Sequence, residues 1–190
     1  MTEWSIQTER LFVRRFQKSD LEQLVGYRND PEVWRFQGWG AGYSSEQASQ
    51  FISEMNTREL GEMGWMQLAI EVITTRKMIG DVALNVLEFE PKTAMIGYTL
   101  AREAWGQGYA AEAVTALLKY CFEELGLHRV RANCDARNQA SWRLLEKLGF
   151  RREAHFVESY LEHRTWFDEF EYAMLEREWF GRNVESDRHL

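Results

Sequence analysis

The sequence WGQGYAAEA, residues 105–113, joins an apolar run to a run with helical periodicity. The apolar run is Met95 to Leu100, so this order predicts a strand, a tight turn and a helix. Gly106 and Gly108 allow positive φ angles and let a ligand approach the main chain. Their N–H groups would lie at the positive end of the helix, where a phosphate or pyrophosphate is the expected ligand.

Two common phosphate-binding motifs do not fit this loop. No lysine followed by a hydroxyl residue stands where a triphosphate and its magnesium would need them, and position 111 is alanine where Gly-x-Gly-x-x-Gly needs its third glycine. The spacing therefore predicts a pyrophosphate cradle without identifying the cofactor. An ordinary strand-to-helix turn is the alternative.

The composition predicts a single globular domain. The chain has 190 residues, 45% of them hydrophobic and 28% charged, with a net charge of −7. We expect one domain over residues 1–180 and a polar C-terminal tail over 181–190. The acidic balance argues against a nucleic-acid or anionic-membrane partner.

Cysteine and histidine usage predicts no structural metal. Cys121 and Cys134 are the only cysteines, and the four histidines show no metal-ligand spacing with them. The chain opens without a basic and apolar leader, and no run approaches ~20 apolar residues. We therefore expect a cytoplasmic protein with reduced thiols.

The hydrophobic pattern alternates between strand and helix signals. Strands are expected at 6–16, 65–73, 78–89, 94–100, 128–134, 150–160 and 169–176, and helices at 20–28, 46–60, 110–125 and 139–148. Ser19 and Glu22 form a capping box for the first helix, and Ser44 or Ser45 caps the second. The three strands between 65 and 100 form an antiparallel meander. The helix that follows them makes the next strand pair parallel.

Three stretches carry a resemblance to a known family: IGYTLAREAWGQGYAAEAV (96–114), NQASWRLLEKLGF (138–150) and TWFDEFEYAML (165–175). They resemble the GNAT superfamily of acyl-CoA-dependent N-acyltransferases, most closely its ribosomal-protein N-terminal alanine and serine acetyltransferases. The resemblance implies an α/β fold with a mostly antiparallel sheet of six or seven strands. It also implies one parallel pair that splays apart, and helices on both faces.

The resemblance implies a coenzyme A site around the glycine loop. The family pattern Gln/Arg-x-x-Gly-x-Gly/Ala falls on residues 105–110, with Trp105 where Gln or Arg is usual. Acetyl-CoA would be bound by Leu100, Trp105, Gly106, Gln107, Gly108, Tyr109, Ala110, Asn138 and Ser141. The backbone of the loop would hold the pyrophosphate, and Leu100 and Asn138 the pantetheine arm.

Catalytic roles also follow from the resemblance. Many members use a tyrosine as the general acid, but Leu145 occupies its place here. Ser141 matches a serine of the alanine and serine acetyltransferases, so we assign it as the acid; the alternative is a helix first-turn serine bonded to its own backbone. We take Glu103 as the candidate base, beside Glu88 and Glu90, and an ordered water would serve equally.

The expected activity is transfer of an acetyl group from acetyl-CoA to a primary amine, by direct attack in a ternary complex. The acceptor is either a protein N-terminus or a small-molecule amine, and the chain is either a monomer or a homodimer. Aromatic residues from Trp34 to Tyr43 either line the acceptor pocket or pack a loop onto the core. A catalytically silent acyl-CoA-binding module is the alternative function.

Overall fold

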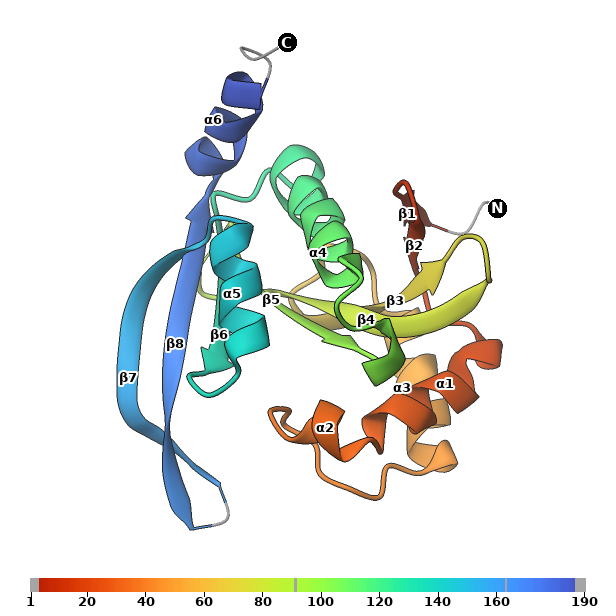
Figure 1. Cartoon of the computed structure of the whole chain (residues 1–190). Coiled ribbons are helices and arrows are strands. Elements are labelled where there is room, and N and C mark those ends of the chain that lie inside the picture. The colour runs from red at the N-terminus through yellow and green to blue at the C-terminus, as the bar shows by residue number, and fades with distance from the viewer. Residues whose placement is uncertain (1–3, 91, 163, 187–190) are drawn as a thin grey trace.

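The computed structural model describes residues 4–90, 92–162 and 164–186, in which an eight-stranded sheet has the order β1-β2-β3-β4-β5-β6-β8-β7 (Figure 1). The strands are β1 (Ser5–Gln7), β2 (Leu11–Arg14), β3 (Gly64–Val72), β4 (Lys77–Val86), β5 (Thr93–Leu100), β6 (Arg129–Asp135), β7 (Arg151–Glu162) and β8 (Thr165–Leu175). The helices are α1 (Leu21–Arg28), α2 (Pro31–Trp34), α3 (Ser45–Thr57), α4 (Tyr109–Lys119), α5 (Gln139–Lys147) and α6 (Glu176–Ser186), with short helical segments η1 (Lys18–Asp20), η2 (Arg102–Ala104) and η3 (Tyr120–Glu124). The predicted mixed α/β architecture is confirmed.

The N-terminal part of the sheet adds a strand to the expected number. The segment 6–16, predicted as one strand, is split into β1 and β2, which pair antiparallel through Ile6 and Val13. Thr8 makes the turn, because its hydroxyl accepts from the Leu11 N–H at 2.9 Å and its N–H donates to the Leu11 carbonyl at 2.9 Å. The sheet therefore has eight strands where six or seven were expected.

The middle of the sheet contains the predicted parallel pair. β5 and β6 are paired over three residue pairs, from Thr93↔Arg129 to Met95↔Arg131. Beyond these pairs β5 stays on β4 and β6 stays on β8, so the strands separate toward their C-terminal ends (Figure 1). The expected splay is present, and it opens beside the glycine loop that follows β5.

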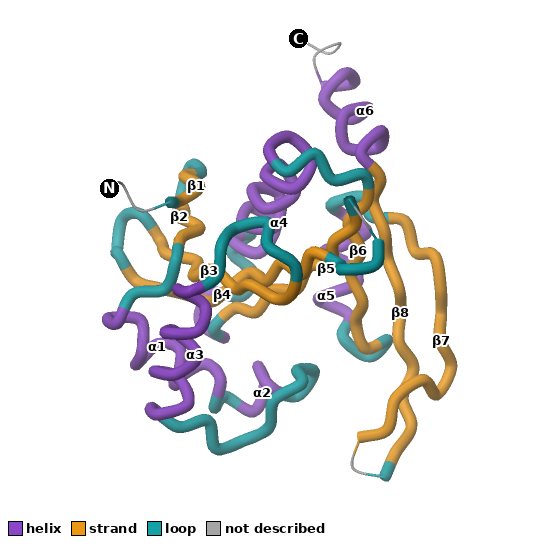
Figure 2. The backbone as a smooth tube through the Cα atoms, turned by 180° about the vertical axis from the view of Figure 1, so that it is seen from behind, coloured by secondary structure: helices purple, strands orange, loops and turns teal. Residues whose placement is uncertain are grey.

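Helices cover both faces of the sheet (Figures 1 and 2). On one face, α4 and α5 contribute fully buried leucines, among them Leu117 and Leu145, to the larger core. On the other, α1 and α3 pack on the sheet through a smaller core that includes Leu24 and Ile52. Burying one such side chain stabilises the fold by about 1.5–3 kcal/mol.

Of the two predicted helix caps, one is confirmed and one is wrong. Helix α3 begins as predicted, with the Ser44 hydroxyl accepting from the Gln47 N–H at 3.2 Å. At α1 the predicted capping box of Ser19 and Glu22 is wrong, because the Asp20 carboxylate accepts from the Gln17 N–H at 2.7 Å instead.

The C-terminal segment is more ordered than expected. The predicted tail 181–190 is helical as far as Ser186, where α6 ends, and residues 187–190 lie outside the described part of the chain. Trp179 of α6 stacks on Phe122 at a centroid distance of 5.8 Å, which anchors the helix on η3. Within the described residues, no helix is long and apolar enough to cross a membrane.

Candidate functional site

The glycine loop has the backbone geometry that its sequence predicts. Gly106 and Gly108 have φ angles of 73° and 80°, and Gly108 is the N-cap residue of α4. Among the described residues, the backbone N–H groups of Gly106, Gly108 and Tyr109 have no hydrogen-bond acceptor. Free N–H groups at the start of an 11-residue helix fit a phosphate or pyrophosphate.

An ion pair from the other end of the chain fixes this loop. Arg10, at the start of β2, binds Glu112 in the first turn of α4 with an Nε–Oε2 distance of 2.7 Å. Its Nη1 also donates to the Gln107 carbonyl at 2.9 Å, and its guanidinium lies 4.7 Å from the Tyr109 ring centroid. Thr8 completes the contact by donating to Glu112 Oε1 at 2.6 Å. Sequence analysis missed this clamp because Arg10 and Glu112 are separated by 102 positions.

The clamp also sets the charge of the loop. Burial opposes ionisation of Glu112, but hydrogen bonds from Thr8 and Arg10 lower the pKa of its carboxyl group. A Cβ at Gly108 would lie 3.4 Å from Arg10 Nη2, so the guanidinium is next to the N-terminus of α4. The loop thus combines free backbone donors with an adjacent cation.

Trp105 and Leu100 contact one another directly. The Trp105 indole N–H donates to the Leu100 carbonyl at 2.9 Å, while 45% of the Trp105 side chain is exposed. Gln107 Nε2 similarly donates to the Glu103 carbonyl at 2.8 Å. The side chains of Trp105 and Gln107 therefore hold the backbone at the C-terminal end of β5 in place. Trp105 stands where the family usually has a Gln or Arg.

Ser141 lies at the start of α5 and faces β5. Asn138 is the N-cap residue of α5, and its Oδ1 accepts from the Ser141 N–H at 3.2 Å. The Tyr98 hydroxyl lies 2.9 Å from Ser141 Oγ and donates to the Ser141 carbonyl at 3.1 Å. Burial raises the pKa of the Tyr98 phenol. Sequence analysis singled out Asn138 and Ser141 but not Tyr98, which stands on the part of β5 that has left β6.

The two cysteines are buried thiols. Cys121 is fully buried, and Cys134 on β6 is 9% exposed. Burial raises the pKa of Cys121 to about 12 and that of Cys134 to about 11. Both are protonated near neutral pH, which makes them poor nucleophiles.

The structure does not bring Glu103 next to Ser141. Glu103 lies on η2 with its side chain 63% exposed, and its Oε1 binds Lys77 Nζ at 3.1 Å. A hydrogen bond to its own backbone and one from Lys77 lower the pKa of Glu103. A general base near neutral pH needs the opposite shift, so the surface ion pair explains Glu103 better than catalysis does.

The aromatic loop 34–43 is anchored on a buried cation. The Arg28 guanidinium lies 4.5, 4.8 and 4.3 Å from the ring centroids of Trp39, Tyr43 and Phe51, and Arg28 is 5% exposed. Its Nη2 also donates to Gln67 Oε1 at 2.9 Å. Trp39 and Tyr43 therefore pack the loop onto the core, as one of the two sequence interpretations expected.

Arg137 connects the same loop to the β7–β8 hairpin. Its guanidinium lies 3.3 Å from the Phe167 ring centroid and 5.6 Å from that of Phe36, and its Nε binds Asp135 Oδ2 at 2.9 Å. Residues 34–43, Arg28, Arg137 and Phe167 together are called the aromatic face below. Its residues come from α1, the loop that follows it, the β6–α5 connection and β8.

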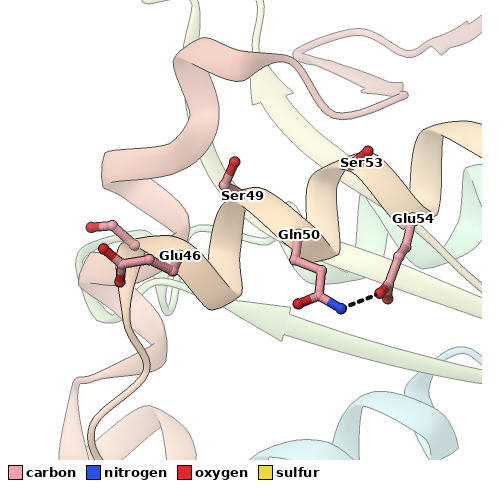
Figure 3. Close-up of a pocket in the computed structure, with 6 residues that line it drawn as sticks. Glu46, Ser49, Gln50, Ser53 and Glu54 are labelled. Carbon is pink, nitrogen blue, oxygen red and sulfur yellow. Dashed lines mark hydrogen bonds between the residues drawn. The ribbon is translucent and has the colours of Figure 1, made fainter.

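A shallow hollow on the outer side of α3 is unrelated to these residues. Its lining is Ser45, Glu46, Ser49, Gln50, Ser53 and Glu54 (Figure 3). The lining is polar and comes from one helix, and it includes no candidate site residue. In the described part of the chain, no three His, Cys, Asp or Glu side chains lie together as a metal site would require.

Comparison with known proteins identifies relatives along the whole chain. Residues 10–151 match the Acetyltransferase (GNAT) domain family. An uncharacterized N-acetyltransferase, p20 of Bacillus licheniformis, is 32% identical over 177 residues, 93% of this chain and 99% of that protein. The crystal structure of a GNAT-family acetyltransferase from Bacillus anthracis superposes with a TM-score of 0.81 at 31% identity, covering 92% of this chain and 99% of that one. The [ribosomal protein uS5]-alanine N-acetyltransferase of Escherichia coli is 30% identical over 95 residues, 50% of this chain and 49% of that protein.

Proposed function

Since the chain belongs to the GNAT acetyltransferase family and is an acetyl-CoA-dependent acyltransferase, we propose that it acetylates a primary amine by direct attack in a ternary complex. The observation that carries the proposal is the glycine loop beside the split between β5 and β6. Free N–H groups at the start of α4 would supply donors for a pyrophosphate, and the part of β5 that is not paired with β6 would be available to a thioester arm. A catalytically silent module would share these features, so activity decides between the two.

The residues of the loop fit the diphosphate portion of acetyl-CoA. The N–H groups of Gly106, Gly108 and Tyr109 would bind the pyrophosphate oxygens, and Arg10 would add a positive charge beside them. Asn138 and the backbone of Leu100 would hold the pantetheine arm. Bound acetyl-CoA would supply the acetyl group as an activated thioester.

Ser141 would act where the carbon–sulfur bond breaks. Its hydroxyl would give a proton to the departing sulfur, while Asn138 fixes its backbone. Water would take the proton that the amine loses, since Glu103 is bound to Lys77. The raised pKa of Cys134 supports direct transfer over a covalent acyl-enzyme.

We propose a peptide N-terminus as the first acceptor class. The E. coli relative acts, by its name, on an alanine of ribosomal protein uS5. Arg137 and Phe167 are the side chains that would contact such a peptide, because they lie where the hairpin meets loop 34–43. A small-molecule amine is the alternative acceptor.

The test is release of free CoA thiol with a panel of amines. The panel contains peptides that begin with alanine or serine, the same peptides with a blocked N-terminus, and a polyamine. We expect release with the free peptides only, and a 100-fold or larger loss of kcat in Ser141→Ala with a much smaller change in the acetyl-CoA Kd. Release with the polyamine alone would assign a small-molecule acceptor. Tight acetyl-CoA binding without any release would instead identify a silent module.

A further inference from the structure

A serine alone is a poor acid for the proposed step. The group that must be protonated is a thiolate, whose conjugate acid has a pKa of about 8.5, and an acid works best when its own pKa is near that range. A phenol has an ordinary pKa of about 10, which burial raises at Tyr98, and it is still a stronger acid than an aliphatic hydroxyl. The family's usual tyrosine is replaced here by Leu145, which is fully buried in the core.

Tyr98 of β5 places a phenol next to Ser141. The Tyr98 hydroxyl is 2.9 Å from Ser141 Oγ, a hydrogen-bond distance, although Tyr98 lies on β5 and Ser141 on α5. The N-cap contact with Asn138 holds the serine backbone, so the hydroxyl rotor is the part of Ser141 that is free to turn. Phenol and serine therefore meet across the split in the sheet.

Two proton arrangements are compatible with these distances. In the first, the phenol donates to the Ser141 carbonyl at 3.1 Å and accepts the serine proton. In the second, the phenol donates to Ser141 Oγ, and the serine proton is then directed away from Tyr98. Only the second arrangement offers the serine proton to a substrate.

We propose that Tyr98 is a positioning residue that turns the Ser141 proton toward the departing sulfur and replaces the proton that Ser141 gives up. This rests on the proposed acetyl transfer. The amine nitrogen bonds to the carbonyl carbon, and the carbon–sulfur bond breaks with its electron pair on sulfur. Ser141 Oγ gives its proton to that sulfur and takes one from Tyr98. The phenolate recovers a proton from water, which balances the proton that the amine released.

The titratable side chains near Tyr98 are uncharged near neutral pH. Besides Ser141 on α5, the titratable side chains that influence it are Cys134 on β6 and Tyr172 on β8. Burial raises the pKa of Cys134 to about 11 and that of Tyr172 to about 12, so both are neutral. Burial raises the pKa of the Tyr98 phenol too, so Tyr98 is also protonated near neutral pH.

The first test needs no turnover. Tyr98→3-fluorotyrosine gives a ¹⁹F signal at this phenol, and we expect Ser141→Ala and the addition of CoA each to shift it. Tyr120→3-fluorotyrosine, a half-buried phenol on η3 that packs on Trp4, is the matched control and should not respond to Ser141→Ala. An unchanged signal at position 98 in Ser141→Ala would overturn the proposal, whatever the acceptor screen finds.

The second test uses the acceptor peptide from the screen. We expect Tyr98→Phe to lower kcat about 10- to 100-fold with the acetyl-CoA KM unchanged, and Tyr98→Phe/Ser141→Ala to be no slower than Ser141→Ala alone. Losses that multiply in the double variant would refute the relay. If wild type acetylates no amine, the proposed function fails, while the ¹⁹F signal still decides whether the pair exists.

Discussion

The glycine loop and the aromatic face are built in different ways. The glycine loop takes its backbone shape from nine consecutive residues, 105–113, since two left-handed glycines and a helix start are local features. The aromatic face combines Arg28 of α1, Arg137 before α5 and Phe167 of β8. A ligand common to a whole family can be bound by a local motif. We propose that the acceptor, which differs between members, is contacted by side chains that only the tertiary structure brings together.

The contrast is not complete, because the loop also depends on one distant residue. Arg10 binds the Gln107 carbonyl and the Glu112 carboxylate, so the turn between β1 and β2 fixes the loop from outside. We therefore expect substitutions in the glycine loop to change only the affinity for acetyl-CoA. Substitutions in the aromatic face should change only the KM for the acceptor.

The largest effect is expected from Gly108→Trp. The residue would need a φ of 80°, and its ring would occupy the space of the free N–H groups. We expect calorimetry to show at least a 100-fold loss of acetyl-CoA affinity, about 2.7 kcal/mol. Gly40→Trp is the matched control on the aromatic loop, where no atom lies within 4 Å of an added Cβ, and it should bind normally. Wild-type affinity in Gly108→Trp would move the cofactor site elsewhere.

An intermediate and reciprocal effect is expected from two arginines. Arg10→Met should weaken acetyl-CoA binding about 10-fold, because the loop loses its clamp and a cation, and should leave the acceptor KM unchanged. Arg137→Met should raise the acceptor KM about 10-fold and leave the acetyl-CoA Kd unchanged, because the contact with Phe167 is lost. Calorimetry and steady-state kinetics on both variants check this. If either variant changes both constants, the two regions are coupled and the division fails.

The smallest effect is expected from Glu112→Gln. The pKa of Glu112 is lowered in the folded protein, so its ionised form stabilises the fold above the unfolded pKa of about 4.3, and that stabilisation is lost as the pH falls through the folded pKa. We expect Glu112→Gln to cost about 1 kcal/mol at pH 7, with little cost below the folded pKa. Urea unfolding at several pH values measures this. Thr8→Val removes one of the hydrogen bonds that lower the pKa of Glu112, so we expect a smaller loss with the same direction of pH dependence, and a loss in Glu112→Gln that does not change with pH would argue against ionisation as the cause.

Local patterns predicted most of the fold. The meander, the parallel pair and the Ser44 cap were correct, because alternation, a crossover helix and a capping side chain act over a few residues. The predicted cap at Ser19 was wrong because Arg14, which is buried, binds Asp20 and fixes a different helix start. Helix α6 carried no sequence prediction, because its contact with the core, Trp179 stacked on Phe122, joins residues far apart in the chain.

The candidate site was predicted in part, for the same reason. Gly106, Gly108, Asn138 and Ser141 belong to contiguous motifs, and the structure places them around the split in the sheet. Tyr98 carried no such signal, since alternation along β5 shows only that one of its faces is buried, not that a phenol reaches a serine 43 positions away. The contact between Tyr98 and Ser141 depends on how β5 and β6 diverge, which the sequence pattern does not show.

The short ladder between β5 and β6 leaves two strand edges facing each other within the sheet. Unpaired strand edges are the surfaces on which other chains add in aggregation. A pantetheine arm held between these strands would cover them, as a neighbouring strand does elsewhere in the sheet. We therefore expect bound acetyl-CoA to make this protein more resistant to aggregation, because the β5–β6 ladder itself covers only three residue pairs.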